Sequence, residues 1–397
     1  MTSATPSRLK QLWLKPLLKL AQKSWWMSLL VWLAAIAPAH AALELRVAIE
    51  QDVSRVTLGS STPATVRDAS GQVLAQLPAG GAVTAQAASG AIQVNQFQTG
   101  QVWVEPSNGG FVFIGDRWYR GRTMVVPTGG GLTAVNYVDL EQYLYSVVGG
   151  EMPTNWPLEA LKAQAVTARS YALYQRQTSA NAVFDVGDTT AWQVYRGVEE
   201  ETNTTQAAVQ QTEGQVLTYN GQIIEAVFHS SSGGHTENVE DVWTQALPYL
   251  RAVQDFDQGA PVYQWNETIP ADRLRQVIPG IGNILSMVPD RTTPRGRIVT
   301  MRVTGEGGTR IVSGAELRRS LQLRSTLFSV TPILGQVASA GNVPSIPTGF
   351  LITGRGFGHG LGMSQWGAYN LASQGYNYQQ IVTHYYTGAT LAKIQVE

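Results

Sequence analysis

The stretch DLEQYLYSVVGGEMPTNWPLEALKAQAVTARSYA, residues 139–172, decides the local fold because it encodes two helices joined by a short connection. Asp139 is typical of a helix N-cap, since its carboxylate can accept a hydrogen bond from the backbone amide of Gln142. The apolar residues that follow share one helix face: Leu140, Leu144 and Val147. Gly149-Gly150 indicates the C-terminal stop of this first helix.

The second helix is predicted to begin at Pro157, because proline suits the first helical position. Apolar residues then recur at spacings of three and four, which predicts one buried face: Leu158, Leu161, Ala165, Ala168 and Ala172. The small alanine side chains indicate that a neighbouring element packs closely against this face.

Glu151 lies between the two predicted helices. Pro153 biases Met152 away from helical geometry, so Glu151 is expected to project from the junction rather than continue the first helix. If carbonyl groups at the helix end point towards Glu151, their partial negative charge raises the pKa of its carboxyl group. A carboxyl group that stays protonated near neutral pH can act as a general acid. The alternative is a solvated loop glutamate.

Residues 42–130 are predicted to form a β-rich N-terminal region. Short runs alternate between apolar and polar residues and are separated by glycine, serine and proline, which is typical of antiparallel strands. The clearest runs are 43–49, 101–104 and 111–114. The glycine-rich stretch 127–131 marks a candidate boundary to the region 131–397.

The residues after the two helices return to β character and end in a mixture of elements. Strands are predicted at 215–219, 223–228, 297–303 and 350–352, and short helices at 270–277 and 313–321. A glycine-rich loop, two short helices ending near Gly375 and Gly388, and a last strand close the chain. Because strands and helices are segregated rather than alternating, the predicted fold class is α+β.

Residues 1–41 are predicted to be a secretory signal peptide. They carry five basic residues and no acidic ones, then an apolar run and the small-residue site Ala39-His40-Ala41. Cleavage after Ala41 is expected. The alternative is an uncleaved anchor, although the apolar run is shorter than the roughly 20 residues that span a bilayer. In both cases we expect the remaining chain to be extracytoplasmic, in the periplasm or the cell wall.

Composition excludes several classes of protein. The 397 residues contain no cysteine, which excludes disulfides, thiolate metal sites and a cysteine nucleophile. With 44% hydrophobic and 14% charged residues, the chain is expected to fold. Without residues 1–41, 28 − 5 = 23 basic residues face 28 acidic ones, a net charge of −5. No basic cluster remains, so we expect no nucleic-acid partner.

The segment FHSSSGGHTENVEDVW, residues 228–243, gathers hydroxyl and imidazole groups at the end of a predicted strand. His229 and His235 are six residues apart without a third ligand, which makes a zinc site a weak alternative. The Gly-x-Ser-x-Gly pattern of serine hydrolases is absent from this segment. Hydrogen bonding to a polar ligand, or within the turn itself, is favoured.

The segment GRGFGHGLGMSQWGA, residues 354–368, has glycine at every second position at its start, which is not the spacing of a phosphate-binding loop. Alternate glycines allow close backbone approach and place His359 not far from Trp366. A flat aromatic ring beside amide and imidazole donors suits a sugar ring. The alternative is a structural turn with a hydrogen-bonded histidine.

Together these segments resemble the stage II sporulation protein D (SpoIID/LytB) family. Three motifs carry the resemblance, which covers roughly residues 90 to 390: 151–172, 231–237 and 358–368. The resemblance implies a peptidoglycan lytic transglycosylase or, in the amidase-enhancer branch, a non-catalytic wall-binding protein that acts with a cell-wall amidase. Its substrate would be the peptidoglycan glycan strand.

The resemblance also implies roles for individual residues. Glu151 would be the catalytic acid and base. The candidates for the substrate-binding cleft are Arg169, His235, His359, Ser364 and Gln365. Some family members bind zinc through Cys-Asp-x-x-His-Cys, where this chain has Gly187-Asp188-Thr189-Thr190-Ala191-Trp192. All three ligands are missing, so we predict no structural zinc and no other cofactor.

Overall fold

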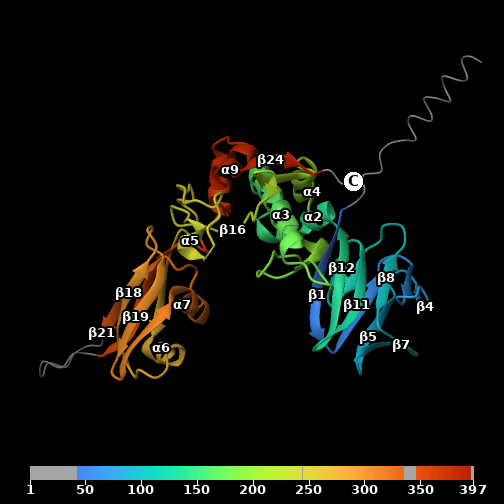
Figure 1. The fold of residues 1–397 in the computed structure, drawn as a ribbon, viewed down its shortest axis with the longest axis horizontal. Helices are drawn as coiled ribbons and strands as arrows, with labels where there is room; N and C mark the ends of the chain where they lie inside the picture. The colour runs from blue at the N-terminus through green and yellow to red at the C-terminus, as the bar shows by residue number, and fades with distance from the viewer. Residues whose placement is uncertain (1–42, 244, 335–345, 395–397) are drawn as a thin grey trace, which may run out of the picture. The chain divides into compact units, whose positions relative to one another are not determined.

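The computed structural model describes residues 43–243, 245–334 and 346–394 of the chain (Figure 1). After Leu43 these residues belong to one compact unit. Strands and helices are segregated along the chain, which confirms the α+β prediction. The predicted signal peptide, residues 1–41, lies outside the described residues. Of the helices that the structure describes, none is both long and apolar enough to cross a membrane.

Two β-sheets make up the first part of the described chain, as the alternating sequence predicts. A seven-stranded sheet has the order β13-β1-β12-β11-β8-β3-β4, and a six-stranded sheet has the order β10-β9-β2-β5-β6-β7. The strands are β1 (Glu44–Val53), β2 (Arg55–Ser60), β3 (Ala64–Arg67), β4 (Val73–Leu77), β5 (Ala82–Ala88), β6 (Ala91–Val94), β7 (Phe97–Thr99), β8 (Val102–Pro106), β9 (Val112–Ile114), β10 (Arg117–Tyr119), β11 (Arg122–Thr128), β12 (Gly131–Asp139) and β13 (Val186–Gly187). Alternate side chains such as Leu45 and Val47 are fully buried.

The glycine-rich stretch 127–131 is a hairpin turn inside the seven-stranded sheet. Thr128 at the end of β11 pairs with Gly131 at the start of β12, and β12 also pairs with β1. One sheet therefore continues across residue 130. The last residue of β12, Asp139, is also the N-cap of α2 (Leu140–Glu151). It accepts hydrogen bonds from the amides of Glu141 and Gln142, as predicted. The sheet thus sets the direction of the helix that carries Glu151.

Helix α2 does not stop at Gly149-Gly150 but runs through both glycines to Glu151, so the predicted helix end is wrong. Neighbouring backbone atoms leave little or no room for a side chain at either glycine. A Cβ atom on Gly149 would lie 2.0 Å from the carbonyl oxygen of Glu200, and one on Gly150 would lie 3.1 Å from that of Val194. The helix ends at Met152, which is extended before Pro153 as predicted.

A Gly149→Ala substitution is expected to destabilise the protein by about 1–3 kcal/mol, because the added methyl group overlaps the Glu200 carbonyl. Helix propensity alone would make alanine more stable than glycine by about 1 kcal/mol. A loss of stability would therefore show that the steric overlap is the larger effect, and a gain would show that helix propensity is. Urea unfolding measures the difference. Gly100→Ala, where no atom lies within 4 Å of the new methyl group, is the control and should change stability little.

Helix α3 (Leu158–Thr178) is the buried centre of the middle part of the chain. It begins one residue later than predicted, with Pro157 as its N-cap. The predicted face is buried at its alanines and Leu161, but Leu158 is exposed, which corrects that assignment. Four helices contact α3: α2, α4 (Asn203–Gln210), α8 (Gln365–Ser373) and α9 (Tyr378–Tyr385). The 3₁₀ helix η1 (Gly197–Glu200) packs on α2.

The strands of the middle part are short. A three-stranded sheet has the order β15-β14-β24, formed by β14 (Gln215–Tyr219), β15 (Gln222–Ile223) and β24 (Thr390–Lys393). The predicted strand 223–228 is interrupted, because Val227 N–H donates to the Glu225 carbonyl in a tight turn that redirects the chain. After the turn, β16 (Phe228–His229) pairs in parallel with β23 (Met363–Ser364). This pairing joins the segments 228–243 and 354–368.

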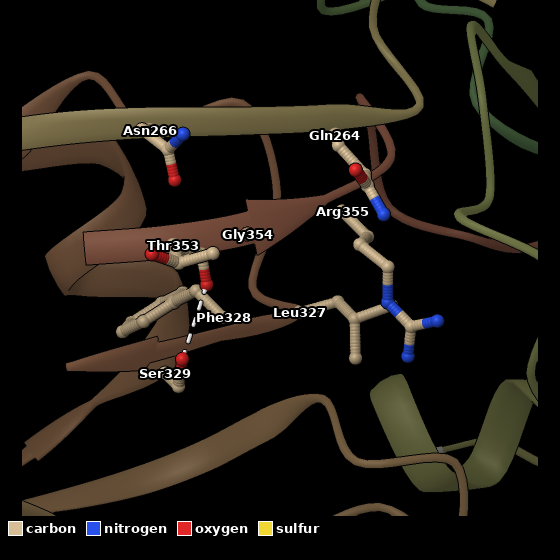
Figure 2. Close-up of a pocket in the computed structure, with 8 residues that line it drawn as sticks. All are labelled: Gln264, Asn266, Leu327, Phe328, Ser329, Thr353, Gly354 and Arg355. Atoms are coloured by element: carbon tan, nitrogen blue, oxygen red, sulfur yellow. Dashed lines mark hydrogen bonds between the residues drawn. The ribbon is translucent and has the colours of Figure 1, made fainter. Parts of the chain in front are cut away.

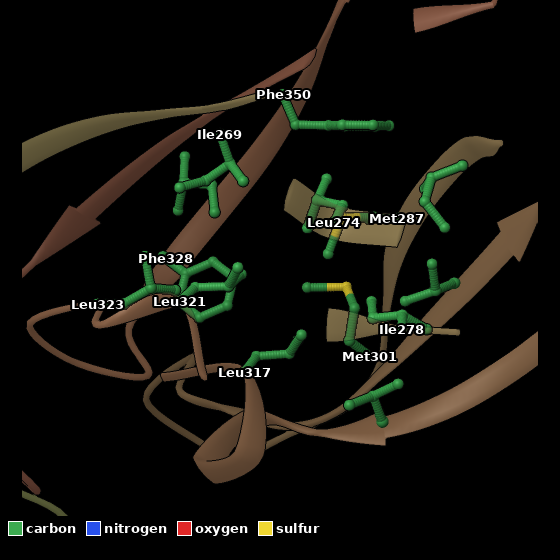
Figure 3. Close-up of a cluster of buried hydrophobic side chains, with 14 of the residues drawn as sticks. Ile269, Leu274, Ile278, Met287, Met301, Leu317, Leu321, Leu323, Phe328 and Phe350 are labelled. Atoms are coloured by element: carbon green, nitrogen blue, oxygen red, sulfur yellow. The ribbon is translucent and has the colours of Figure 1, made fainter. Parts of the chain in front are cut away.

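Residues 264–334 and 346–355 form two further three-stranded sheets around their own apolar core. Their orders are β17-β22-β21 and β18-β19-β20. The elements are β17 (Gln264–Pro270), α6 (Ala271–Val277), β18 (Ile284–Thr292), β19 (Ile298–Gly305), β20 (Gly308–Ser313), α7 (Gly314–Leu321), β21 (Phe328–Leu334) and β22 (Pro347–Arg355). Leu274 of α6, Met301 of β19 and Phe350 of β22 are fully buried between them (Figure 3). The short helices predicted at 270–277 and 313–321 are α6 and α7. The single-turn helix α5 (Val239–Val242) precedes this part.

Candidate functional site

Glu151 is held at the end of α2 by two segments that are distant in sequence. Its Oε1 accepts a hydrogen bond of 2.8 Å from the Val194 backbone amide. Its carbonyl oxygen accepts one of 3.2 Å from Nε2 of Gln365, the first residue of α8. The side chain of Glu151 is half-buried. The carboxyl group is therefore fixed in position rather than free in solvent, which disfavours the solvated-loop alternative.

Burial raises the pKa of the Glu151 carboxyl group above its ordinary value. The Val194 amide, the Gln365 side chain and the positive charge of Arg196 lower this pKa, but burial is the larger effect. The direction is the one expected from the sequence, whereas the cause is burial rather than the helix carbonyls. Among the described residues no second carboxylate contributes to the shift. The site therefore contains one carboxyl group whose raised pKa favours the protonated form.

Three aromatic rings gather near the Gln365–Glu151 contact. Trp366 directly follows Gln365, and its ring centroid lies 4.7 Å from that of Trp156 and 5.3 Å from that of Tyr369. Trp156 and Tyr369 are 4.9 Å apart, and all three side chains are half-buried. Flat, partly exposed rings next to an acid can hold a sugar ring by its apolar face. We call these three residues the aromatic shelf.

The sequence did not predict this shelf as a unit. The glycine-rich segment predicted Trp366 not far from His359, but the His359 ring instead lies 5.5 Å from Trp243 and 5.2 Å from His229. Tyr369 was missed altogether. One available signal was its spacing of three residues from Trp366 on a predicted helix, since residues three apart share a helix face.

Arg169 makes structural contacts, and the cleft role implied by the family resemblance stays a prediction. Its side chain is fully buried within α3. Nε and Nη2 donate to the two carboxylate oxygens of Glu141 at 2.8 and 2.6 Å, and Nη1 donates to the Gln215 carbonyl at 3.0 Å. Arg169 therefore ties α3 to the first turn of α2 and to β14.

His359 and Ser364 are also engaged within the protein. The Nε2 atom of His359 lies 2.9 Å from the Phe228 carbonyl, and Nδ1 accepts from the Leu361 amide at 3.0 Å. Burial, assisted by the charge of Arg297, lowers the pKa of His359 to about 4, so the ring is neutral. Ser364 is fully buried and caps α8 by accepting from the Gly367 amide. Both residues shape the glycine-rich loop and are not free to bind substrate through these atoms.

Gln365 and His235 occupy different places. Gln365 is nearly buried and contacts Glu151, so it positions the acid. His235 is exposed and lines a separate cavity of about 260 Å³. Of the five predicted cleft residues, Gln365 is therefore the one that the structure brings into contact with Glu151.

The hydroxyl groups of the segment 228–243 are used inside the protein. Ser231 Oγ and Ser232 Oγ donate to Asp257 and Asp255, each at 2.5 Å. The amides of Gly233 and Gly234 donate to Asp257 as well. Burial and the neighbouring Asp255 raise the pKa of Asp257. This segment is a hydrogen-bonded turn, which is the second of the two readings favoured from the sequence.

The structure offers no support for a zinc hydrolase site in this segment. His229 is buried and donates from Nδ1 to the Leu361 carbonyl, whereas His235 is exposed. Among the residues described, no group of three or more His, Asp or Glu residues could hold a metal ion.

In the stretch 187–192, where the family resemblance implied a zinc motif in some members, the chain has an apolar contact. A Cβ atom on Gly187 would lie 2.8 Å from Cδ1 of Trp192, so the indole packs directly on the glycine backbone. Gly187 and Trp192 are the first and last residues of that stretch. The packing explains how this turn can be held without a metal, and the absence of zinc stays a prediction.

The sequence motifs are joined in the fold, because β16 pairs with β23 and Gln365 contacts Glu151. Together these motifs define one class of protein. The sequence profile of the Stage II sporulation protein (SpoIID) family matches residues 128–219, and a domain of unknown function (DUF8618) matches residues 250–362. The chain belongs to the SpoIID family.

Several known proteins resemble this chain over most of its length. It is 34% identical over 280 residues to Stage II sporulation protein D of Bacillus subtilis, covering 66% of this chain and 76% of that protein. It is 32% identical over 287 residues to an uncharacterized protein of Brachyspira hyodysenteriae, covering 71% and 74%. It is 31% identical over 293 residues to the amidase enhancer of Bacillus subtilis, covering 62% of this chain but 40% of that protein.

Proposed function

We propose that this protein is a peptidoglycan lytic transglycosylase that cleaves the β-1,4 bond after N-acetylmuramic acid and leaves a 1,6-anhydro end. Membership of the SpoIID family supports a role at the cell wall. The observation that carries the finer proposal is the half-buried carboxyl group of Glu151, whose pKa is raised by burial and which is joined through Gln365 to the segment that carries the aromatic shelf.

One carboxyl group is sufficient for this reaction because the substrate supplies the nucleophile. Ordinary glycosidases use two carboxyl groups, one as acid and one as base or nucleophile. Here Glu151 protonates the departing glycosidic oxygen. The resulting carboxylate then takes the proton from the sugar's 6-hydroxyl as that oxygen bonds to the anomeric carbon. Because the hydroxyl belongs to the same sugar, ring closure has the proximity advantage of an intramolecular reaction.

The surroundings of Glu151 suit both steps. Oε1 is held by the Val194 amide, which leaves Oε2 as the oxygen that carries the transferable proton. Gln365 holds the last turn of α2 through the Glu151 carbonyl, so it orients the acid without entering the reaction. The aromatic shelf would hold a saccharide ring beside the acid, as the flat rings of Trp156 and Trp366 allow.

The test is product analysis. Purified protein, incubated with cell-wall glycan strands, is expected to release fragments ending in 1,6-anhydro-N-acetylmuramic acid, which are 18 mass units lighter than hydrolysed ends. Mass spectrometry of the digest makes the distinction. Reducing, hydrolysed ends in place of anhydro ends would contradict the proposed mechanism, because they require water as the nucleophile.

A second candidate function comes from the relative named amidase enhancer. In that case the chain would bind peptidoglycan and stimulate a cell-wall amidase without cleaving glycan itself. The protein would then sediment with insoluble peptidoglycan and accelerate a partner amidase, and both effects would persist in the Glu151→Gln variant. Either function requires the chain to be exported, which the predicted signal peptide would provide.

A further inference from the structure

A second polar site lies on the sheet formed by β17, β22 and β21. Two cavities of about 350 and 260 Å³ adjoin there and share the lining residues Leu327 and Arg355. Figure 2 shows Arg355 and Leu327 at one end of the larger cavity and Asn266, Thr353 and Ser329 at the other. Neither cavity is lined by Glu151 or by the aromatic shelf.

Strand register explains why these side chains share one face. Gln264 of β17 pairs with Arg355 of β22, and one step along the same face Asn266 pairs with Thr353, which also pairs with Ser329 of β21. Side chains two residues apart on a strand point to the same side. All five are exposed. The opposite side is packed, since Trp265 is buried and lies against the backbone of Gly354.

The exposed charged side chains of this face are arginines. Neither Arg355 nor Arg295, which lines the smaller cavity, makes a side-chain hydrogen bond or ion pair with any residue in the described part of the chain. His235 adds an exposed imidazole. Glu237 is the one carboxylate in the lining; it is 1% exposed, and its Oε1 accepts from Thr293 and lies 3.7 Å from Nε of Arg297. A carboxylate ligand at the exposed surface would meet the guanidinium groups of Arg355 and Arg295.

The other polar residues of the lining indicate which kind of ligand the carboxylate belongs to. The side-chain amides of Gln264 and Asn266 both donate and accept hydrogen bonds, as does the amide of a peptide. Aromatic surface for a sugar is scarce. Phe328 is 7% exposed, and Tyr263 is the one aromatic side chain that lines the smaller cavity. This face therefore differs in chemistry from the aromatic shelf.

From these contacts we infer that the β17-β22-β21 face is a binding site for an extended acidic peptide, and that its occupant is the peptide arm of peptidoglycan. The Arg355 and Arg295 guanidinium groups bind a free carboxylate of the peptide. Gln264, Asn266, Ser329 and Thr353 bind its amides. The identity of the polymer rests on the proposed function, whereas the preference for a peptide carboxylate rests on this face alone. The site lies within residues 250–362, the matched domain of unknown function.

Calorimetric titration of the full chain with a synthetic peptide tests this inference. The probe is a tetrapeptide with a free C-terminal carboxylate and a free glutamyl α-carboxylate, and its comparison is the same peptide with both groups amidated. We expect the acidic peptide to bind at least about tenfold more tightly, as charge-assisted hydrogen bonds do. Its affinity should fall as salt is raised.

Arg355→Gln is expected to remove that tenfold preference, because it replaces the charge and keeps an amide. Arg67→Gln is the matched control, since Arg67 is also an exposed strand arginine without a side-chain partner in the described part of the chain. Glu151→Gln should bind the peptide like the unaltered protein, so glycan cleavage and peptide binding can fail separately. Equal affinity for the acidic and amidated peptides overturns the inference, as does Arg355-dependent binding of N-acetylmuramic acid without binding of the peptide.

Discussion

Glu151→Gln is expected to eliminate 1,6-anhydro products, with a loss of turnover of about 10²- to 10⁴-fold, the usual contribution of a general acid–base group. Glutamine keeps the size of the side chain and can still accept from the Val194 amide. It cannot give up a proton to the glycosidic oxygen. The effect should be near the upper limit, because no second carboxylate among the described residues affects the acid and could replace it.

Stability measurements separate this loss from unfolding. Burial raises the pKa of Glu151 in the folded protein, so protonation favours the folded state. The stabilisation is complete below the pKa of the unfolded chain and is lost as the pH rises through the folded-state pKa. Because Glu151→Gln removes the buried charge, the variant should be at least as stable as the unaltered protein at neutral pH. A variant that is stable yet fully active would exclude Glu151 as the acid and favour the amidase-enhancer function.

Arg169→Met is expected to lower the free energy of unfolding by about 3–5 kcal/mol, the range seen when one partner of a buried ion pair is removed. Arg169 is fully buried, and its loss removes the donor to the Gln215 carbonyl and leaves the Glu141 carboxylate with the Gly214 amide as its donor. Urea unfolding measures the change. Arg176→Gln on the same helix is the control, since Arg176 is 40% exposed and lies 3.8 Å from Asp185, and it should change stability by less than about 1 kcal/mol.

The same variant decides between the structural role of Arg169 and the cleft role implied by the family resemblance. If Arg169 only joins α3 to α2 and β14, the double variant with Glu141→Gln should recover part of the lost stability, because the unpaired carboxylate is removed. If the Arg169→Met variant keeps its stability but loses glycan binding, Arg169 would instead have the cleft role that the family resemblance implies.

Local signals in the sequence predicted much of the scaffold. The Asp139 cap depends on a side chain and an amide three residues away, and the extended conformation of Met152 depends on the next residue, Pro153. Alternating burial in β1 follows from the two-residue repeat of a strand. The helix end at Gly149-Gly150 was wrong for an instructive reason. Glycine is typical both of a helix stop and of a close contact, and only the neighbouring carbonyl of Glu200 shows which applies.

The sequence by itself thus determined the fold class, the SpoIID motifs and Glu151 as the candidate acid. The tertiary structure alone decided which polar residues remain available to a ligand. Arg169 and Ser364 are buried, and His359 is hydrogen-bonded within the protein. Trp156 packs against Trp366, which is over 200 positions away in the chain. The physical reason is that caps and strand alternation depend on neighbours along the chain, whereas burial and pKa depend on packing between distant segments.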